Sequence, residues 1–342
     1  MALRARDRRR GPAWSRPVSL TTAFVILMLG YAVVAVLIRG LPLSNLPALL
    51  TVVSLPYVPL GVLAAVSALL LCHRVFLALA GSAVLAITLA VQLPWYVGGH
   101  TADLGRHLTI RVLSSNLRYG QADPGFFVEL AKSSADVITV SELTAEAVER
   151  FDRAGLRRAF PYSSLLPRPR ADGIGLWSRH PITVMPSSEH GNNSATVRLT
   201  IPGIQHDPIL SSVHLMSPIA GDENTFADWN HKITAAKSEF AAYAEAAGPA
   251  AVIIAGDFNS TVDMRQFRDL LDVGYQEAVR QTGAGFGPTY SPHPRIPPLI
   301  TIDHVLTRNS TATSIHTVDV PGSDHRALLA TVAVPLDPTD NT

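Results

Sequence analysis

Polar residues able to bind metal or transfer protons stand at the ends of apolar, β-branched segments in the second part of the sequence. They are Asn116, Glu142, His214, Asp257, Asn259, Asp303, Asp324 and His325. Asp257 and Asn259 are two residues apart, so an extended chain would turn both side chains to the same side. Carboxylate and amide oxygens, in a set without thiolates, suit a hard octahedral cation such as Mg²⁺ or Mn²⁺. The pattern therefore indicates a metal site assembled at strand ends.

Each of these residues also has an ordinary structural explanation. The stretch 257–259 is a common set of turn residues, Glu142 could cap the helix that follows it, and Asp324 could cap a turn. A lone histidine on a strand is more often a structural group with satisfied hydrogen bonds. What favours function is the ordered combination of all eight residues, not any one of them.

Strands and helices alternate around these residues. Strands are expected at 108–115, 136–141, 173–178, 196–201, 209–213, 251–255, 300–306 and 327–334, and helices at 123–134, 144–154 and 226–247. Strands mixed with helices are typical of an α/β sandwich in which helices cover the sheets. Strand ends of such a sandwich can direct side chains into one cleft.

The first 97 residues differ from the rest because they are mostly apolar. Uncharged apolar runs occupy 18–38, 46–71 and 75–97, and each can cross a bilayer core of ~30 Å. We predict three spanning helices, with two spans and a re-entrant segment as the alternative, since Pro56 and Pro59 interrupt the second run. No small-residue cleavage site precedes Arg39, and further apolar runs follow, which argues against a cleaved signal peptide.

Positive charge before the first apolar run predicts the membrane topology. Six arginines precede Val18, which places the N-terminus in the cytoplasm, and an odd number of spans then places everything after Gly98 outside. The predicted organisation is a cytoplasmic basic N-terminus at 1–17, three transmembrane helices at 18–97, a linker at 98–107, a catalytic domain at 108–334 and a disordered tail at 335–342.

The remainder of the chain is acidic. It holds twenty basic and twenty-six acidic residues, a formal charge of −6, although the whole chain carries +1. Such a domain is not suited to hold nucleic acid by unspecific attraction to phosphates, so nucleic acid is a disfavoured partner. Cys72 is the only cysteine, which excludes an intrachain disulfide and a cysteine-based zinc site. The twelve histidines show no His-Glu-x-x-His spacing.

The motif series resembles that of the endonuclease/exonuclease/phosphatase (DNase-I-like) superfamily. The matching segments are Ser115-Asn116-Leu117, Ser141-Glu142, Val213-His214-Leu215, Gly256-Asp257-Phe258-Asn259, Ile302-Asp303-His304 and Ser323-Asp324-His325, in the order of that family. The resemblance covers about 108–334 and implies a four-layer α/β sandwich behind an all-α transmembrane anchor. One departure is Ser141, where a glutamine is commoner in the family.

The resemblance also implies roles for the site residues. Glu142, helped by Asn116 and with Asp324 as a further candidate ligand, would hold Mg²⁺ or Mn²⁺. Asp257 would orient or deprotonate the attacking water with Asn259 beside it. Three further roles remain. His325 would contact the scissile phosphate, Asp303 or Asp324 would orient a histidine, and His214 would contact phosphate or donate a proton.

Two features resemble the bacterial membrane-anchored members, including the teicoplanin-resistance type. They are the anchor and the pair of segments 285–290 and 297–303. This resemblance implies a metal-dependent phosphoester hydrolase acting on a cell-envelope phospholipid or polyprenyl diphosphate at the bilayer. Alternatives are an extracellular nuclease and a non-catalytic envelope binding module. A serine hydrolase is disfavoured because Ser323 and His325 share one turn. The sequence leaves the oligomeric state unknown.

Overall fold

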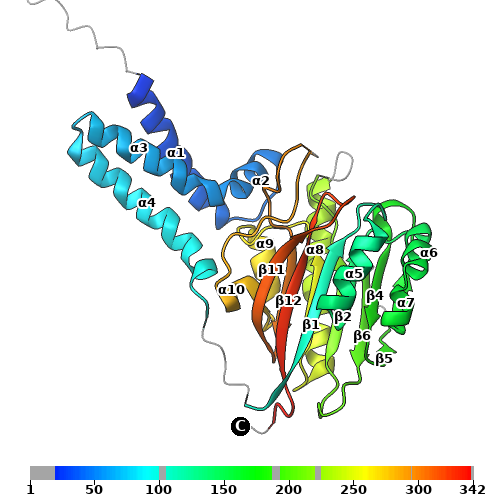
Figure 1. Ribbon diagram of the computed structural model, residues 1–342. Helices are drawn as coiled ribbons and strands as arrows, with labels where there is room; N and C mark the ends of the chain where they lie inside the picture. The colour runs from blue at the N-terminus through cyan, green and yellow to red at the C-terminus, as the bar shows by residue number, and fades with distance from the viewer. Residues whose placement is uncertain (1–19, 100–104, 187–192, 220–224, 294, 340–342) are drawn as a thin grey trace, which may run out of the picture.

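The chain folds into an N-terminal group of helices and an α/β domain, as Figure 1 shows. The computed structural model describes residues 20–99, 105–186, 193–219, 225–293 and 295–339. The predicted cytoplasmic segment 1–17 and half of the predicted linker, 100–104, lie outside the described residues, as do the last three residues of the predicted tail.

The helical part contains two helices long and apolar enough to cross a membrane, α1 (Leu20–Arg39) and α4 (Val75–Tyr96). Between them lie α2 (Leu46–Val53), a short 3-10 turn η1 (Leu55–Tyr57) and α3 (Val58–Leu71), which form a pair bent by 41°. Helix α3 packs against both α1 and α4. The described residues therefore contain two spanning helices, or three if the bent pair counts as one span.

Two six-stranded sheets form the centre of the α/β domain. The first has the order β11-β12-β1-β2-β4-β3 and the second the order β5-β6-β7-β8-β10-β9. The strands of the first sheet are β1 (His107–Asn116), β2 (Val137–Ser141), β3 (Tyr162–Leu166), β4 (Ile174–Ser178), β11 (Thr311–Asp319) and β12 (Arg326–Pro335). Those of the second are β5 (Ile182–Val184), β6 (Asn193–Leu199), β7 (Ile209–His214), β8 (Val252–Asp257), β9 (Gln276–Glu277) and β10 (Asp303–Arg308).

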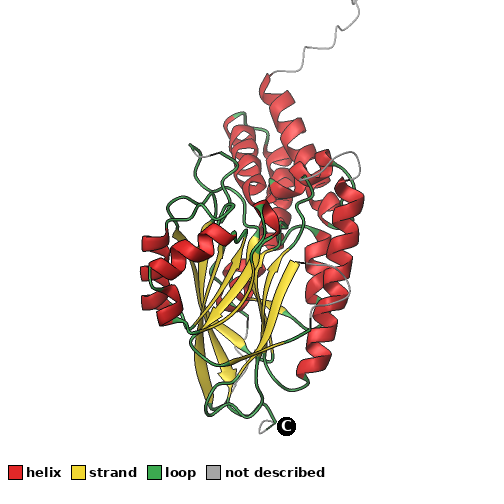
Figure 2. Ribbon diagram, turned by 90° about the vertical axis from the view of Figure 1, so that its right-hand side faces the viewer, coloured by secondary structure: helices red, strands yellow, loops and turns green. Residues whose placement is uncertain are grey.

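The two sheets pack face to face, and helices cover their outer faces (Figure 2). The first sheet is covered by α5 (Pro124–Ser134), α6 (Ala145–Arg153) and α7 (Leu156–Ala159), and the second by α8 (Thr225–Ala247) and α9 (Arg265–Leu271). Two further short helices are η2 (Arg170–Asp172) and α10 (Ala278–Thr282). The expected four-layer sandwich is confirmed.

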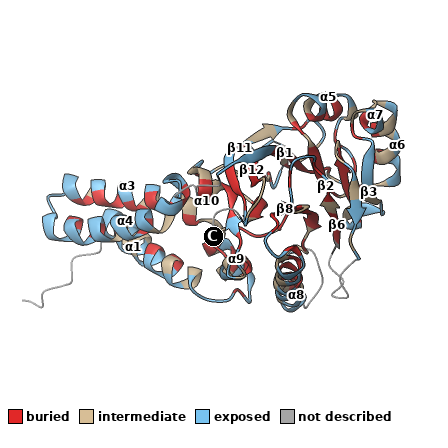
Figure 3. Ribbon diagram, turned by 90° about the horizontal axis from the view of Figure 1, so that it is seen from below, coloured by how far each residue is buried: buried red, intermediate tan, exposed pale blue. Residues whose placement is uncertain are grey.

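Alternation along the strands explains these layers. In β8, Ile253 packs in the apolar core between the sheets, whereas the next residue, Ile254, packs against the outer helices. In β2, Val137 and Ile138 divide in the same way. Because successive strand residues point to opposite faces, the continuous apolar runs in the sequence are strands buried on both sides. Figure 3 shows this buried interior in the sheets.

The helical part is docked on the α/β domain. Val52, Leu55 and Val62 belong to the same buried apolar cluster as Trp229 and Phe267 of the outer helix layer. Polar contacts reinforce the junction, because the Arg39 Nε lies 2.7 Å from Asp263 Oδ1 and Gly285 N donates to the Trp95 carbonyl at 2.7 Å. The ends of α1 and α4 that face the domain are thus held directly against it.

Candidate active site

Six strand ends meet at one edge of the sandwich. Strands β1 and β2 run parallel, as do β7 and β8, so their last residues lie at the same edge. Strand β10 runs antiparallel to β8 and β12 antiparallel to β1, so their first residues lie there too. Some site residues follow an apolar run in the sequence and others precede one. They still meet at one site because their strands run in opposite directions.

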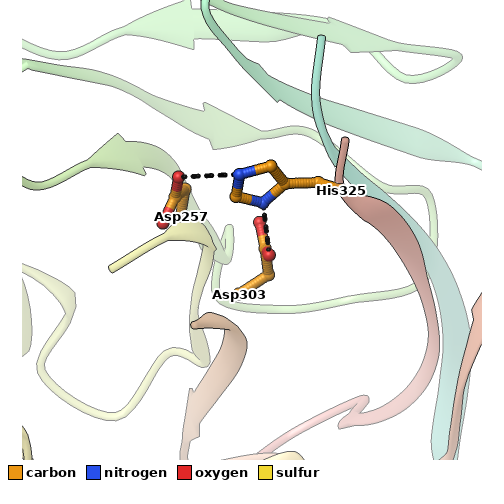
Figure 4. Close-up of side chains that lie close together, drawn as sticks. All are labelled: Asp257, Asp303 and His325. Carbon is orange, nitrogen blue, oxygen red and sulfur yellow. Dashed lines mark hydrogen bonds and ion pairs between the residues drawn. The ribbon is translucent and has the colours of Figure 1, made fainter. Parts of the chain in front are cut away.

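A carboxylate–imidazole–carboxylate cluster occupies the middle of this edge. His325 Nδ1 lies 2.8 Å from Asp303 Oδ2, and His325 Nε2 lies 3.8 Å from Asp257 Oδ2 (Figure 4). All three side chains are buried. Asp303 pairs with Asp257 across β10 and β8, so the backbone register sets their separation. Tyr290 packs its ring against the His325 imidazole at 4.9 Å between centroids.

The charges in this cluster shift one another's pKa. Burial raises the pKa of Asp257, and the Asp303 charge raises it further, against the lowering effect of His325 and His214. Burial lowers the pKa of His325, but the charges of Asp303 and Asp257 outweigh burial and raise its pKa to about 10. His325 is therefore a cation at neutral pH, held between two carboxyl groups.

Asn116 connects this cluster to Glu142. Its Nδ2 donates to Glu142 Oε1 at 3.0 Å and to Asp257 Oδ2 at 2.9 Å. The second oxygen of Glu142 accepts the Tyr119 N–H at 2.7 Å. Glu142 has φ +58, a left-handed conformation that costs a non-glycine residue about 1–3 kcal/mol. The strand end thus directs this carboxylate into the cleft at a conformational cost.

His214 and Asn259 flank Asp257 on the other side. His214 Nδ1 lies 2.9 Å from the Ala171 carbonyl, which fixes that nitrogen as the donor, and its Nε2 lies 3.6 Å from Asp257 Oδ2. Asn259 donates its backbone N–H to Asp257 Oδ1 at 2.8 Å, and its Nδ2 lies 3.3 Å from His214 Nε2. Both Asp257 oxygens therefore accept hydrogen bonds within the described residues.

Gly256 is required by the close approach of two strands. Its φ is +154, and a Cβ at this position would lie 1.9 Å from the Val213 carbonyl oxygen. No side chain can be accommodated there without moving β7 away from β8. The glycine therefore keeps His214 and Asp257 in register as neighbours.

The eight predicted site residues come together, at two depths. Those that line a cleft of about 640 Å³ are Glu142, His214, Asp257, Asn259, Asp324 and His325. Asn116 and Asp303 lie behind the cleft surface and bond to its lining. Asp324 lies towards the rim, with Arg118 Nε 3.8 Å from its Oδ2. Ser323 donates its hydroxyl to the Asn116 carbonyl, a contact that serves a structural role.

Several cleft residues were missed from the sequence. Tyr119, Tyr290 and Lys232 line the cleft, and so do Leu49 and Val53 of the helical anchor. Tyr290 lies in segment 285–290, whose resemblance to the membrane-anchored members could have pointed to it. Leu49 and Val53 sit in an apolar run that only indicates a membrane segment, and nothing local to them predicts contact with the site.

The residues fit a divalent cation. Asp257, Asp303 and His325 each carry a possible ligand atom, and these atoms lie within 4.8 Å of one another. The two carboxylates can bind the metal beside a cationic His325, whereas His325 itself would have to lose its proton first. Asp303 Oδ1 is buried without a hydrogen-bond partner in the described residues, so one carboxylate oxygen is free for a ligand. The predicted ligands Glu142, Asn116 and Asp324 are different residues, and their assignment to the metal stays a prediction.

Comparison with known proteins identifies the family. The profile of the Endonuclease/Exonuclease/phosphatase family matches residues 106–325. The chain belongs to this family. No curated protein matches the sequence. The endonuclease/exonuclease/phosphatase assignment agrees with the two-sheet fold and supports a phosphoester hydrolase, since members are phosphoesterases or nucleases. Members typically depend on divalent metal, in keeping with the buried Asp/Asp/His cluster.

Solved structures share the fold of this endonuclease/exonuclease/phosphatase domain. A 3′ phosphatase, NExo from Neisseria, solved with product DNA hairpin, has a TM-score of 0.51 and 16% identity, covering 65% of this chain and 98% of its own. A family protein from Bacteroides thetaiotaomicron has a TM-score of 0.51 and 12% identity, covering 67% of this chain and 99% of its own. At these identities the likeness is one of fold alone.

Proposed function

We propose that this chain is a membrane-anchored, divalent-metal-dependent phosphoester hydrolase of the cell envelope, with its catalytic domain outside the cytoplasm. Its proposed substrate is a phosphorylated lipid, either a phospholipid or a polyprenyl diphosphate. The observation that carries the proposal is the buried cluster of Asp257, Asp303 and His325 at the bottom of a cleft, in a chain of a hydrolase family. Mg²⁺ or Mn²⁺ is the proposed metal, because the ligands are mainly oxygens.

The side chains divide the chemistry of hydrolysis between them. Asp257, whose pKa is raised by burial, accepts the proton of the attacking water, and Asn259 holds it in place. His325, cationic between two carboxyl groups, stabilises negative charge on the phosphoryl oxygens. His214 Nε2 lies 3.6 Å from Asp257 Oδ2, and His214 is the proposed proton donor to the leaving oxygen. A metal held by Glu142 and its neighbours would add Lewis-acid stabilisation of that charge.

The surface of the anchor supports a location in the bilayer. Leu27, Phe76 and Leu71 are 72%, 89% and 82% exposed on helices with an apolar composition. Such exposure is costly in water and favourable in lipid. Arg39 and Trp95 both contact the domain, so α1 and α4 end on the domain side, and α3, the second half of the bent pair, is the segment that returns the chain across the membrane. This arrangement supports three crossings and an N-terminus opposite the domain.

The charge of the domain favours a lipid over a nucleic acid. Beyond residue 98 the chain carries a formal charge of −6, and a nucleic-acid enzyme gains most of its affinity from cations that meet phosphates. A lipid substrate is already concentrated at the bilayer and needs no such surface. An extracellular nuclease and a non-catalytic binding module are the outcomes that the test must separate.

The test uses the full chain in lipid nanodiscs. Release of inorganic phosphate from a polyprenyl diphosphate and cutting of plasmid DNA are each measured with Mg²⁺ and with EDTA. The variant Asp257→Ala is compared with Asp319→Ala, which removes a carboxylate that is 79% exposed on β11. We expect metal-dependent phosphate release that only Asp257→Ala abolishes. DNA cutting alone would replace the lipid hydrolase with a nuclease. Silence from a folded protein would exclude the polyprenyl diphosphate and leave a phospholipid substrate or a binding module.

A further inference from the structure

The cleft that contains Asp257 and His325 has one wall made by the membrane anchor. Leu49 and Val53 of α2 line the cleft together with Met264 and Ile300 of the catalytic domain. The cleft therefore has a polar end of carboxylates and imidazoles and an apolar side. The apolar side begins with residues that belong to the membrane part of the chain.

Helix α2 is fixed to the catalytic domain and cannot be a loosely tethered segment. Asn45 caps it by accepting the Ala48 N–H at 3.0 Å. The Leu43 carbonyl accepts from Asn230 at 3.0 Å and from Gln266 at 3.2 Å. At the other end, the Tyr57 hydroxyl donates to the Leu299 carbonyl at 2.7 Å. Both ends of the segment 45–57 are thus bonded to the domain that carries the catalytic residues.

The two faces of α2 have different surroundings. Leu49 is 6% exposed and faces the domain, whereas Leu46 and Leu50 are 49% and 60% exposed on the outer face. Figure 1 shows α2 between the bundle of α1, α3 and α4 and the α/β domain. One helical turn of apolar side chains therefore separates the cleft from the surface that the proposed function places in lipid.

The apolar lining continues beyond the cleft. Val53 and Ile300 also line a smaller cavity of about 40 Å³, whose other walls include Trp95 and Phe286. Tyr57 packs edge to face against Phe286, one of the residues that line this smaller cavity, at 5.5 Å between ring centroids. Apolar side chains thus extend from the catalytic cleft along the junction of anchor and domain. A soluble, highly charged substrate would gain nothing from such a lining.

We propose that α2 of the anchor is a substrate-binding element: Leu49 and Val53 hold the first carbons of the substrate's hydrocarbon chain while its phosphate lies at the Asp257–His325 cluster. This inference rests on the proposed function and adds the residues that select a lipid-linked phosphate over a soluble one. Each methylene group that moves from water onto this wall strengthens binding about fourfold. The anchor therefore contributes to recognition as well as to location.

Val53→Ser in the full chain tests the wall, with Leu50→Ser on the outer face of the same helix as the matched control. Rates are measured in nanodiscs with Mg²⁺ on a long-chain and a short-chain isoprenoid diphosphate and on p-nitrophenyl phosphate. For Val53→Ser we expect kcat/KM to fall about tenfold on both isoprenoid diphosphates, mainly through KM, and to fall clearly less on p-nitrophenyl phosphate, which has no hydrocarbon chain. Leu50→Ser should match the wild type on all three.

The outcomes separate this inference from the proposed function. A wild type that hydrolyses the two isoprenoid diphosphates no better than p-nitrophenyl phosphate would overturn the role of α2 in binding and leave the hydrolase intact. An equal loss on all three substrates in Val53→Ser would also overturn it, since that is the mark of a structural defect. A wild type that hydrolyses none of the three with Mg²⁺ would remove the polyprenyl diphosphate as the substrate and, with it, this role of α2.

Binding without turnover gives a second measurement, because the chain has a single cysteine, Cys72. In a Cys72→Ser background, Val53→Cys is labelled with a maleimide in the presence of a long-chain polyprenyl monophosphate or of inorganic phosphate. We expect the lipid to slow labelling at least fivefold and inorganic phosphate to have no effect. Leu50→Cys should be labelled at the same rate with either compound. Equal protection of both positions would overturn the proposal.

Discussion

Two histidine–carboxylate pairs lie on either side of strand β10, and they have opposite characters. Asp303 faces the cleft and bonds to His325 at 2.8 Å, whereas the next residue, His304, faces the outer helix layer and lies 3.3 Å from Glu277. Strand alternation alone sends these neighbours to opposite faces. Both pairs are buried, so burial and pairing do not distinguish a catalytic pair from a structural one.

What differs is whether the hydrogen bonds are completed. His304 Nε2 lies 2.9 Å from the Ser260 carbonyl, and Glu277 uses its second oxygen to cap α10, so this pair has protein partners on both sides. Asp303 Oδ1 has no partner among the described residues, and His325 meets a second carboxyl group, Asp257. The incomplete pair, with excess negative charge, is therefore the one that fits the proposed cation and phosphate.

The largest expected effect comes from the open pair. Asp257→Asn should lower kcat about 10³-fold, because a general base and its charge are lost together. The melting temperature of the metal-free protein should stay the same or rise, because the repulsion between Asp257 and Asp303 is removed. Phosphate release and thermal unfolding check both parts. A variant that loses activity and also unfolds would show that Asp257 is needed for the fold.

His304→Leu should have the opposite profile. The substitution leaves the Glu277 Oε1 and the Ser260 carbonyl without their buried partner, which should lower the free energy of unfolding by about 2–4 kcal/mol. Activity per folded molecule should remain within about threefold of the wild type. Chemical denaturation and phosphate release measure the two effects. A loss of kcat with unchanged stability would refute the contrast between the pairs.

Asp303→Asn should fall between these two. It keeps the shape of the partner but removes the charge that contributes to the raised pKa of His325. We expect kcat to fall about 100-fold and the pKa of His325 to decrease. NMR titration of the imidazole in the metal-free protein and the pH profile of kcat test this. Asp324, at the rim, raises that pKa less than Asp303 does, so Asp324→Asn is the matched control and should lower the pKa of His325 by less.

The pH dependence of stability follows from the same group. The pKa of His325 is raised from 6.5 to about 10, so the folded protein binds this proton more tightly than the unfolded chain. Its contribution to stability is therefore fully present below pH 6.5 and is lost as the pH rises towards 10. In EDTA, the stability advantage of the wild type over His325→Gln should shrink across that interval. An advantage that grows with pH would show the assigned charge state to be wrong.

Part of the fold and of the candidate site could be predicted from the sequence. Apolar runs predicted most of the long strands and helices, because strands buried on both faces leave an unmistakable pattern. Short or edge strands such as β5, β9 and β11 were missed, because they have few buried residues and weak periodicity. The eight residues that the motifs nominated all lie at one edge of the sandwich. Their catalytic and metal-binding roles stay predictions.

The sequence could not predict which residues the fold brings to the site from afar. Val53 is about two hundred residues from Asp257, and only tertiary packing makes them line one cleft. Likewise Asp303 and His304 are adjacent, and no local signal tells which of them faces the substrate. The cluster of possible metal-binding side chains in the structure is Asp257, Asp303 and His325, which are not the predicted ligands. Spacing along the chain does not reveal which residues of neighbouring strands lie close together.

The smallest expected effect tests the junction between anchor and domain. Arg39 Nε lies 2.7 Å from Asp263 Oδ1, and Asp263 is also 3.4 Å from Gln92 of α4. Asp263 ends the loop that begins at Asn259, so α1 and α4 hold the segment that follows the catalytic strand. Arg39→Gln leaves a carboxylate that is 1% exposed with a weaker partner. We expect a loss of about 2 kcal/mol in stability and of less than tenfold in kcat.

Arg265→Gln provides the control for that experiment. Its pair with Asp269 has side chains that are 49% and 42% exposed, so the pair should contribute little. If Arg39→Gln lowers kcat while p-nitrophenyl phosphate and lipid substrates lose activity equally, the anchor positions the catalytic loop in addition to binding the lipid chain. If only stability falls, the ion pair is structural like the His304–Glu277 pair, and recognition by α2 is then the anchor's only contribution to catalysis.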